Sequence, residues 1–206
     1  MPTAYFIGGA PRSGKSTAIQ RLIELRPMLA TSSDAIRDAI KGVLVEEENP
    51  ALFKTARGKT DSKRNVQAMR EHPETVLPHY LGEYEITWRS VLDFVNSTLD
   101  DGRDVVIEGV AILPHNLQKL NFEYKAVIIA NLEDQTETML VHARANSHDW
   151  LHKYDDEVIR AFGNFNMLQN KYYYDEAKSC GTPVVVIDND DFMSSINKAV
   201  STLLDS

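Results

Sequence analysis

The segment GAPRSGKS, residues 9–16, has the composition and spacing of a phosphate-binding loop. Its glycines let the backbone curl so that successive N–H groups point at phosphate oxygens, and the helix expected after it adds the positive end of its dipole. Lys15 would reach the outer phosphates, and the Ser16 hydroxyl would join the shell of a magnesium ion. The segment therefore predicts binding of a nucleoside triphosphate with Mg²⁺. The predicted nucleotide-binding residues are Gly9, Ala10, Pro11, Arg12, Ser13, Gly14, Lys15, Ser16 and Thr17.

Asp34 and Arg37 follow a second apolar segment, where open α/β sheets bind their ligands. Asp34 would accept the proton of a substrate hydroxyl as the γ-phosphate transfers. Arg37, one helical turn later, would hold an anionic group of the substrate. The alternative is ordinary helix capping, with Ser33 as N-cap and Asp34 as a first-turn acid. Beside a phosphate-binding loop, the substrate-binding interpretation is favoured.

Glu108 and Gly109 end a third apolar segment. A carboxylate at a strand end can face magnesium through water, so Ser16 and Glu108 are the predicted metal-site residues. Glu108 is also a candidate substrate contact, and Gly109 would let the substrate approach the backbone closely. The sequence leaves open whether Asp34 or Glu108 is the catalytic base.

Residues 144–160 interrupt two helical patterns late in the chain and are expected to form a lid. A lid would bring positive charge onto the transferring phosphoryl group and exclude water. Arg144 and Arg160 are the candidates for this charge, with Lys153 behind them. The alternative is that both arginines are ordinary surface residues of helices.

These residues need a scaffold, and the chain alternates short apolar runs with longer amphipathic segments. That alternation predicts an α/β fold with a parallel sheet and crossover helices. The predicted strands are Ala4–Gly8, Met28–Ser32, Asp104–Glu108, Tyr124–Ala130 and Pro183–Asp188. The predicted helices are Lys15–Leu25, Ser33–Lys41, Glu83–Asp101, Asp134–Arg144, Asp155–Ser179 and Asp191–Leu204.

Residues 42–81 fit the alternation poorly and are expected to be a partly helical, substrate-binding insertion over one end of the sheet. Six basic residues and one acid lie between Phe53 and Arg70, so this part carries +5 while the whole chain carries −8. The basic residues are Lys54, Arg57, Lys59, Lys63, Arg64 and Arg70. They would form either a flap over an anionic substrate or a solvated helix face.

The composition narrows the functional classes further. A chain of 206 residues with 43% hydrophobic and 25% charged residues fits one compact soluble domain. Its net charge of −8 argues against nucleic acid or an anionic membrane as a partner. A single cysteine, Cys180, excludes an internal disulfide, and apolar runs of about five residues are too short to span a membrane. We expect a cytoplasmic protein, and the sequence leaves its oligomeric state open.

Three passages give the chain a family resemblance. They are Ile7–Ala10 running into the phosphate-binding loop, Ser33–Arg37, and the run from Val105 to Pro114. Together they resemble the small P-loop kinases related to adenylate kinase, shikimate kinase and the zeta toxins, and most of all the 2-phosphoglycerate-kinase-like set. The resemblance covers most of the chain and is weakest at residues 42–81. Relatives of that set often carry histidine where Ala111 stands here.

The resemblance implies a P-loop NTPase fold of three layers, with five parallel strands in the order 2-3-1-4-5 and helices on both faces. It also implies an insertion that clamps the acceptor and a lid that closes over ATP. By position, Gly14, Lys15 and Ser16 would bind phosphates and magnesium, and Asp34 would lie near the acceptor hydroxyl. Arg37 would then lie near the anionic group of the acceptor, and Arg144 near the adenine or the phosphates.

The favoured function is therefore a kinase that moves the γ-phosphate of ATP to a hydroxyl of a small molecule bearing a phosphate or carboxylate. The alternatives are a nucleotide or nucleoside kinase, a zeta-toxin-like kinase, and a P-loop ATPase or switch without a small acceptor. A regulatory GTPase is disfavoured because the nearest string to its guanine motif, Asn170-Lys171-Tyr172-Tyr173, lacks the aspartate.

Overall fold

The computed structural model describes residues 1–53 and 62–205, with residues 62–65 described by their backbone alone. The strands are β1 (Ala4–Gly8), β2 (Leu29–Ser32), β3 (Val105–Gly109), β4 (Tyr124–Ala130) and β5 (Val184–Val186). The helices in the described ranges are α1 (Lys15–Leu25), α2 (Ser33–Lys41), α3 (Pro50–Phe53), α4 (Ser62–Glu71), α5 (Pro73–Asp100), α6 (Pro114–Leu117), α7 (Thr136–Ala145), α8 (Asp156–Cys180) and α9 (Phe192–Asp205).

The strands form one parallel sheet in the order β2-β3-β1-β4-β5, which confirms the expected topology. Strand β1 lies at the centre, and its five residues are all buried, as expected for a strand covered on both faces. The register pairs Ile7 with Glu108 and Ser32 with Glu108. The segments that follow β1, β2 and β3 therefore leave the sheet at the same edge.

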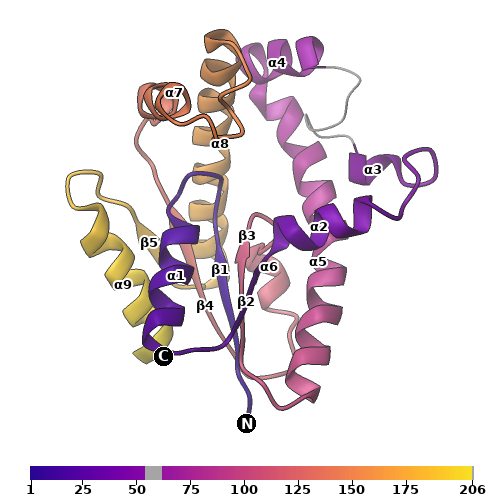
Figure 1. Cartoon of the computed structure of the whole chain (residues 1–206), viewed down its shortest axis with the longest axis vertical. Coiled ribbons are helices and arrows are strands. Elements are labelled where there is room, and N and C mark those ends of the chain that lie inside the picture. The colour runs from indigo at the N-terminus through magenta and orange to yellow at the C-terminus, as the bar shows by residue number, and fades with distance from the viewer. Residues whose placement is uncertain (54–61, 206) are drawn as a thin grey trace.

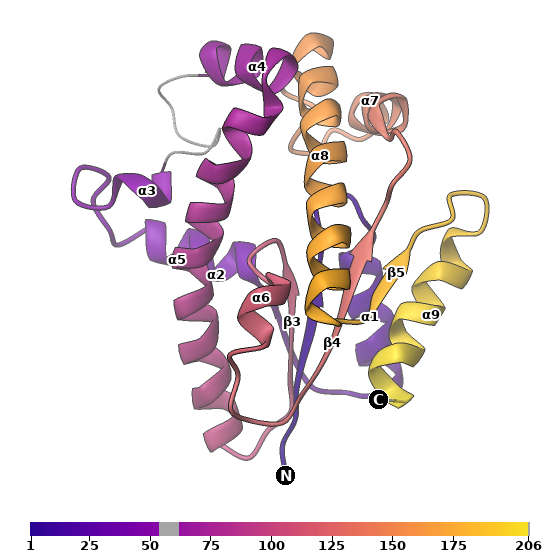
Figure 2. The same ribbon diagram turned by 180° about the vertical axis from the view of Figure 1, so that it is seen from behind.

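Helices cover both faces of the sheet, as Figures 1 and 2 show. Tyr5 and Ile7 of β1 point to one face and pack with buried residues of α1 and α9. Ala4 and Phe6 point to the other face and pack with α5, where Phe6 contacts the Trp88 ring at 5.6 Å between centroids. Helix α8 covers the rest of that second face. The alternation along β1 thus produces the three layers.

Helix α5 begins at Pro73, so the predicted start at Glu83 is wrong. Pro73 occupies the first helical turn, where its missing N–H is not needed, but Pro78 lies inside the helix, where a proline removes a backbone hydrogen bond. Packing overrides that local cost, because Val76 is buried in a cluster shared with α4, α7 and α8.

Helix α5 has 28 residues and α8 has 25, but no helix in the described ranges is both long and apolar enough to span a bilayer.

Candidate active site

The segment between β1 and α1 forms a concave backbone loop. Gly9, Arg12 and Gly14 have φ angles of 144°, 64° and 94°, interspersed with residues of ordinary φ. A Cβ at Gly9 would lie 2.1 Å from the carbonyl oxygen of Ile129, so no other residue fits there without a shift of the backbone. Positive φ angles at such spacing turn neighbouring N–H groups toward a common point, which is the geometry of an anion-binding nest. The loop therefore fits the phosphates that the sequence predicts.

Lys15 is buried at the start of α1, and its Nζ donates to the carbonyl oxygen of Ala10 at 2.6 Å. Burial lowers the pKa of this ammonium, while the nearby carboxylates of Glu108 and Asp34 oppose the shift. An ammonium with little water around it interacts strongly with any anion that reaches it. Lys15 is thus placed where the loop would present a positive charge to phosphate oxygens.

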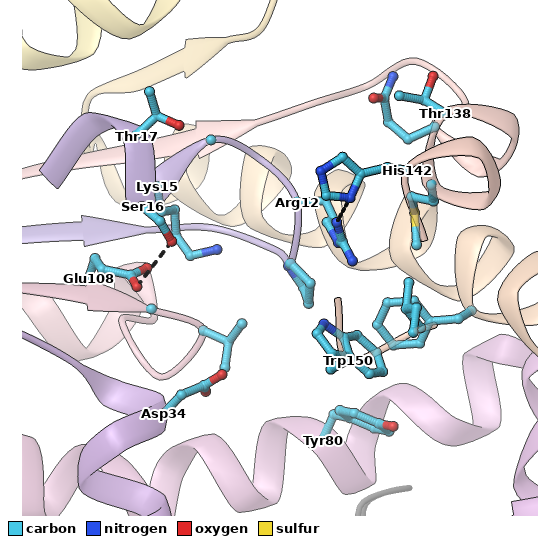
Figure 3. Close-up of a pocket in the computed structure, with 18 of the residues that line it drawn as sticks. Arg12, Lys15, Ser16, Thr17, Asp34, Tyr80, Glu108, Thr138, His142 and Trp150 are labelled. Carbon is cyan, nitrogen blue, oxygen red and sulfur yellow. Dashed lines mark hydrogen bonds between the residues drawn. The ribbon is translucent and has the colours of Figure 1, made fainter. Parts of the chain in front are cut away.

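Glu108 and Asp34 line the same cavity as Lys15 (Figure 3). The Ser16 Oγ donates to Glu108 Oε1 at 3.4 Å, and burial raises the pKa of the Glu108 carboxyl, with the charge of Lys15 opposing. Asp34 stands in the first turn of α2, whose N-cap is Ser32, since the Ser32 Oγ accepts from the N–H of Ala35. The sequence had offered Ser33 as the cap, and the structure corrects that by one residue.

Arg37 is buried among carboxylates. It donates to Asp34 at 2.9 Å and to Asp38 at 3.0 Å, and its Nε lies 3.4 Å from Glu83. Lys41 donates to the same Glu83 carboxylate at 2.9 Å. Arg37 therefore links α2 to α5 through Glu83 and orients the Asp34 side chain. It also lines the cavity.

Arg12, at the tip of the loop, is held from the far side of the cavity. Its Nη2 donates to both oxygens of Asp149 at 2.5 and 2.6 Å, and the Asp149 side chain is almost fully buried. The Nδ1 of His142, on α7, donates to the same carboxylate at 2.8 Å. Burial alone would raise the pKa of Asp149, but the hydrogen bonds from Arg12, the Leu151 N–H and His142 lower it to about 2. Asp149 thus stays ionised and holds the Arg12 guanidinium in place.

The two arginines favoured for the lid do not line the cavity. Arg144 donates to Asp156 and to the carbonyl oxygens of His152 and Tyr154, which closes the segment between α7 and α8. Arg160 pairs with Glu137 on the surface. Among these three arginines, all within the described residues, Arg12 of the loop lines the cavity, whereas Arg144 and Arg160 do not.

Most of the basic residues of the expected flap lie outside the described residues. These are Lys54, Arg57 and Lys59, together with the side chains of Lys63 and Arg64. Arg70 is described, and it pairs with Glu71 and Glu157 on the surface. The flap thus stays a prediction.

A cavity of about 1140 Å³ lies between the loop, α2 and the end of β3. Its lining includes the loop residues Pro11 to Thr17 apart from Ser13. Asp34, Arg37, Glu108 and Gly109 also line it. Its far side is formed by residues that the sequence analysis did not single out, such as Tyr80, Glu83, His142 and Trp150. No motif marks these residues, since they come together only when α5, α7 and the segment after α7 pack.

The oxygen-bearing side chains at the loop suit a magnesium ion. Ser16 Oγ and the Glu108 carboxylate are already neighbours, and hydroxyl and carboxylate oxygens are the ligands that Mg²⁺ takes beside nucleotide phosphates. Ser16 and Glu108 would hold the ion, directly or through water.

Gly109 offers a test of how tightly β3 and α2 meet. Its φ is +144°, and a Cβ there would lie 2.0 Å from Ser33 Oγ, which accepts from the N–H of Ala111. We expect Gly109→Ala to lower the free energy of unfolding by roughly 2–4 kcal/mol, measured by chemical denaturation. Gly82→Ala is the matched control, because Gly82 has open space around it and lies within α5. The control should be neutral or stabilising by about 0.5–1 kcal/mol. Equal stability of the two variants would contradict the tight contact.

If the chain has the kinase function that the sequence predicts, Asp149→Asn should lower its kcat by roughly tenfold and raise its KM for ATP, because Arg12 loses the charge that holds it. The variant should also change the acid stability. Since the pKa of Asp149 is depressed to about 2, its stabilising contribution is present above about pH 4 and is lost as the pH falls towards 2. Unfolding curves between pH 5 and pH 2 should show this component in the wild type and not in the variant.

Asp156→Asn is the control for that experiment, because Asp156 pairs with Arg144 while 60% exposed. Exposed pairs contribute little, so this variant should keep both the kinetics and the acid profile. An Asp149→Asn variant that behaves like Asp156→Asn would contradict the role given to Arg12.

Comparison with protein-family models finds no match for this chain. Two curated proteins match at low identity. The chain is 27% identical to a 2-phosphoglycerate kinase of Methanopyrus kandleri and 25% identical to a 2-phosphoglycerate kinase of Methanococcus vannielii, with 97% of the chain aligned in each case. The chain spans 60% and 63% of the length of these two relatives.

The fold of the chain is similar to that of a solved structure. Shikimate kinase from Bacteroides thetaiotaomicron superposes with a TM-score of 0.53 over 99% of both chains, at 16% sequence identity. This likeness concerns architecture, and it agrees with the strand order and with the phosphate-binding loop after β1. The chain therefore has the fold of the P-loop kinases.

Proposed function

We propose that this protein is a kinase that transfers the γ-phosphate of ATP to a hydroxyl group of a small metabolite. One observation carries the proposal: a complete phosphate-binding loop, with Lys15 buried in it, opens into the same cavity as the carboxylates of Asp34 and Glu108. A switch protein needs the loop, but it does not need a second carboxylate facing a space large enough for an acceptor. The kinase names of the sequence relatives support the same class.

Each side chain has a distinct task in this proposal. Backbone N–H groups of the loop and Lys15 bind the phosphates and take up the charge that develops as the bond from the γ-phosphorus to the bridging oxygen breaks. Asp34, which Arg37 holds in place, accepts the proton of the acceptor hydroxyl while the hydroxyl oxygen forms its bond to the γ-phosphorus. Magnesium, when bound at Ser16 and Glu108, would supply further positive charge to the phosphates.

Arg12 takes the place that the lid arginines were expected to fill. It lines the cavity at the loop, and Asp149, which also accepts from His142, fixes its guanidinium from the opposite side. A guanidinium held in this way stabilises the transferring phosphoryl group without having to reorganise. The ion pair between Arg12 and Asp149 also connects the loop to the segment between α7 and α8. This connection would keep water from the reacting groups.

For the acceptor, the names of the two sequence relatives favour a small anionic hydroxy compound. A panel of hydroxy acids, their phosphates, sugars and nucleosides should be assayed with ATP and Mg²⁺ by acceptor-dependent release of ADP. The proposal expects at least one acceptor to raise ADP release well above the rate without acceptor. Tight ATP binding with no response across the panel would favour an ATPase or switch.

A further inference from the structure

One side of the cavity is formed by aromatic and apolar side chains. Tyr80 of α5 and Trp150 of the segment after α7 are the aromatic residues that matter most here, and Trp150 is 38% exposed. The apolar residues beside them in the wall are Val66, Met69, Met139, Leu151 and Phe162. This wall joins the insertion side of the cavity to its lid side, since its residues come from α4, α5, α7, the segment after α7, and α8.

The two aromatic rings are held firmly from behind. Trp150 meets Phe162 with ring centroids 5.0 Å apart at an interplanar angle of 86°, and Phe162 is 9% exposed. Tyr80 meets the fully buried Phe165 at 4.7 Å and 54°. Rings fixed in this way lose little conformational freedom when they bind a ligand, so they form a preorganised surface.

The polar groups of the reaction lie across the cavity from this surface. Figure 3 shows Tyr80 and Trp150 facing the space that separates them from Asp34, Ser16 and Glu108. An acceptor whose hydroxyl reaches Asp34 would extend its remaining atoms toward Tyr80 and Trp150. The wall can therefore select acceptors by the part of the molecule that does not react.

We propose that the acceptor carries a planar ring that binds against Trp150 and Tyr80 while its hydroxyl faces Asp34. This inference rests on the proposed kinase function and deepens it, because it names the chemical class of the acceptor. Aromatic residues prefer offset or edge-to-face contacts with another ring, and two such contacts correspond to about a tenfold gain in affinity over a ligand without a ring. The ring distinguishes this acceptor from 2-phosphoglycerate, the compound in the names of the sequence relatives.

Binding can be measured without any phosphate transfer. The chain has two tryptophans, and Trp88 is 5% exposed in the core against Phe6, so Trp88→Phe keeps a ring there and leaves Trp150 as the sole tryptophan fluorophore. With a non-hydrolysable ATP analogue present, this variant is titrated with two matched pairs, phenyllactate against lactate and uridine against ribose, and also with 2-phosphoglycerate.

The proposal expects saturable quenching of Trp150 by at least one ring-bearing probe, with a dissociation constant at least about tenfold below that of its ringless partner. The same affinity for both members of each pair, or no saturable change with any ring-bearing probe, would overturn it. Tighter binding of 2-phosphoglycerate than of every ring-bearing probe would also overturn it.

Variants at Trp150 complete the test by a separate binding assay, such as calorimetry. Trp150→Ala should abolish the preference for the ring-bearing probe and leave the dissociation constant of the ATP analogue within twofold, whereas Trp150→Phe should retain most of the preference. An unchanged preference in Trp150→Ala would contradict the assignment. Ring binding without any acceptor-dependent ADP release would instead leave the subsite in place and remove the kinase function, so the two failures are distinguishable.

Discussion

Lys15→Ala is expected to lower the rate of phosphotransfer from ATP by roughly 10³-fold or more. Lys15 is buried at the loop, so little water screens its charge. The same burial lowers the pKa of its ammonium group. Alanine removes that charge from the place where the leaving oxygen and the γ-phosphate become more negative. ATP affinity should also fall, since in the proposed function the ammonium would contact the phosphates before transfer as well as during it. Single-turnover kinetics and nucleotide titration measure the two effects separately.

Two controls show whether that loss is specific. Lys15→Met keeps the length of the buried side chain without its charge and should be as inactive as the alanine variant, while its unfolding midpoint stays near that of the wild type. Lys171→Ala removes a lysine that is 70% exposed and pairs with Asp175 on α8, so it should leave the rate unchanged. Full activity in Lys15→Met would mean that the charge of Lys15 has no part in the reaction.

Asp34→Asn is expected to lower kcat by roughly 10²- to 10⁴-fold, because the amide cannot accept the proton of the acceptor hydroxyl. ATP binding should change by no more than about threefold, since Asp34 is assigned to the acceptor rather than to the nucleotide. The loss should thus appear in the chemical step and not in nucleotide affinity. Comparing the kcat with the dissociation constant for an ATP analogue makes the distinction.

Asp38→Asn is the matched control, since Asp38 also accepts from Arg37 but does not line the cavity. Its kcat should stay within about threefold of the wild type.

Glu108→Gln tests whether Asp34 or Glu108 is the catalytic base, which the sequence left open. If Glu108 belongs to the metal site, this variant should need a higher magnesium concentration for half-maximal rate while keeping much of its kcat. A Glu108→Gln variant with the larger loss of kcat, beside an active Asp34→Asn, would exchange the two roles.

Much of the scaffold could be predicted because its signals are local. The apolar runs of β1 and β4 were located without error at Ala4–Gly8 and Tyr124–Ala130, and the boundaries of α1 and α2 were also correct. Each of these elements has a sequence in which periodicity and end signals agree. The turn between β1 and α1 could be predicted for the same reason, because its residues are contiguous and its glycines serve a backbone geometry that few other residues adopt.

The parts that could not be predicted depend on contacts between distant segments. Arg12 and Asp149 are separated by 137 positions, and no pattern near Asp149 indicates a partner at the loop. Arg144 and Arg160 were favoured because they are arginines in the right region, but nearby carboxylates at Asp156 and Glu137 bind them. Local sequence can show that a charge is present, but it cannot show which partner the fold will bring to it.

The most direct measurement is a transfer experiment with ATP that carries a radioactive γ-phosphate, run against the acceptor panel with the products separated by chromatography. We expect the wild-type protein to place the label on the hydroxyl of at least one small acceptor. Lys15→Ala and Asp34→Asn should give almost no labelled acceptor under the same conditions. Label that appears only as inorganic phosphate with every acceptor, or an Asp34→Asn variant that labels the acceptor as fast as the wild type, would contradict the proposed kinase function.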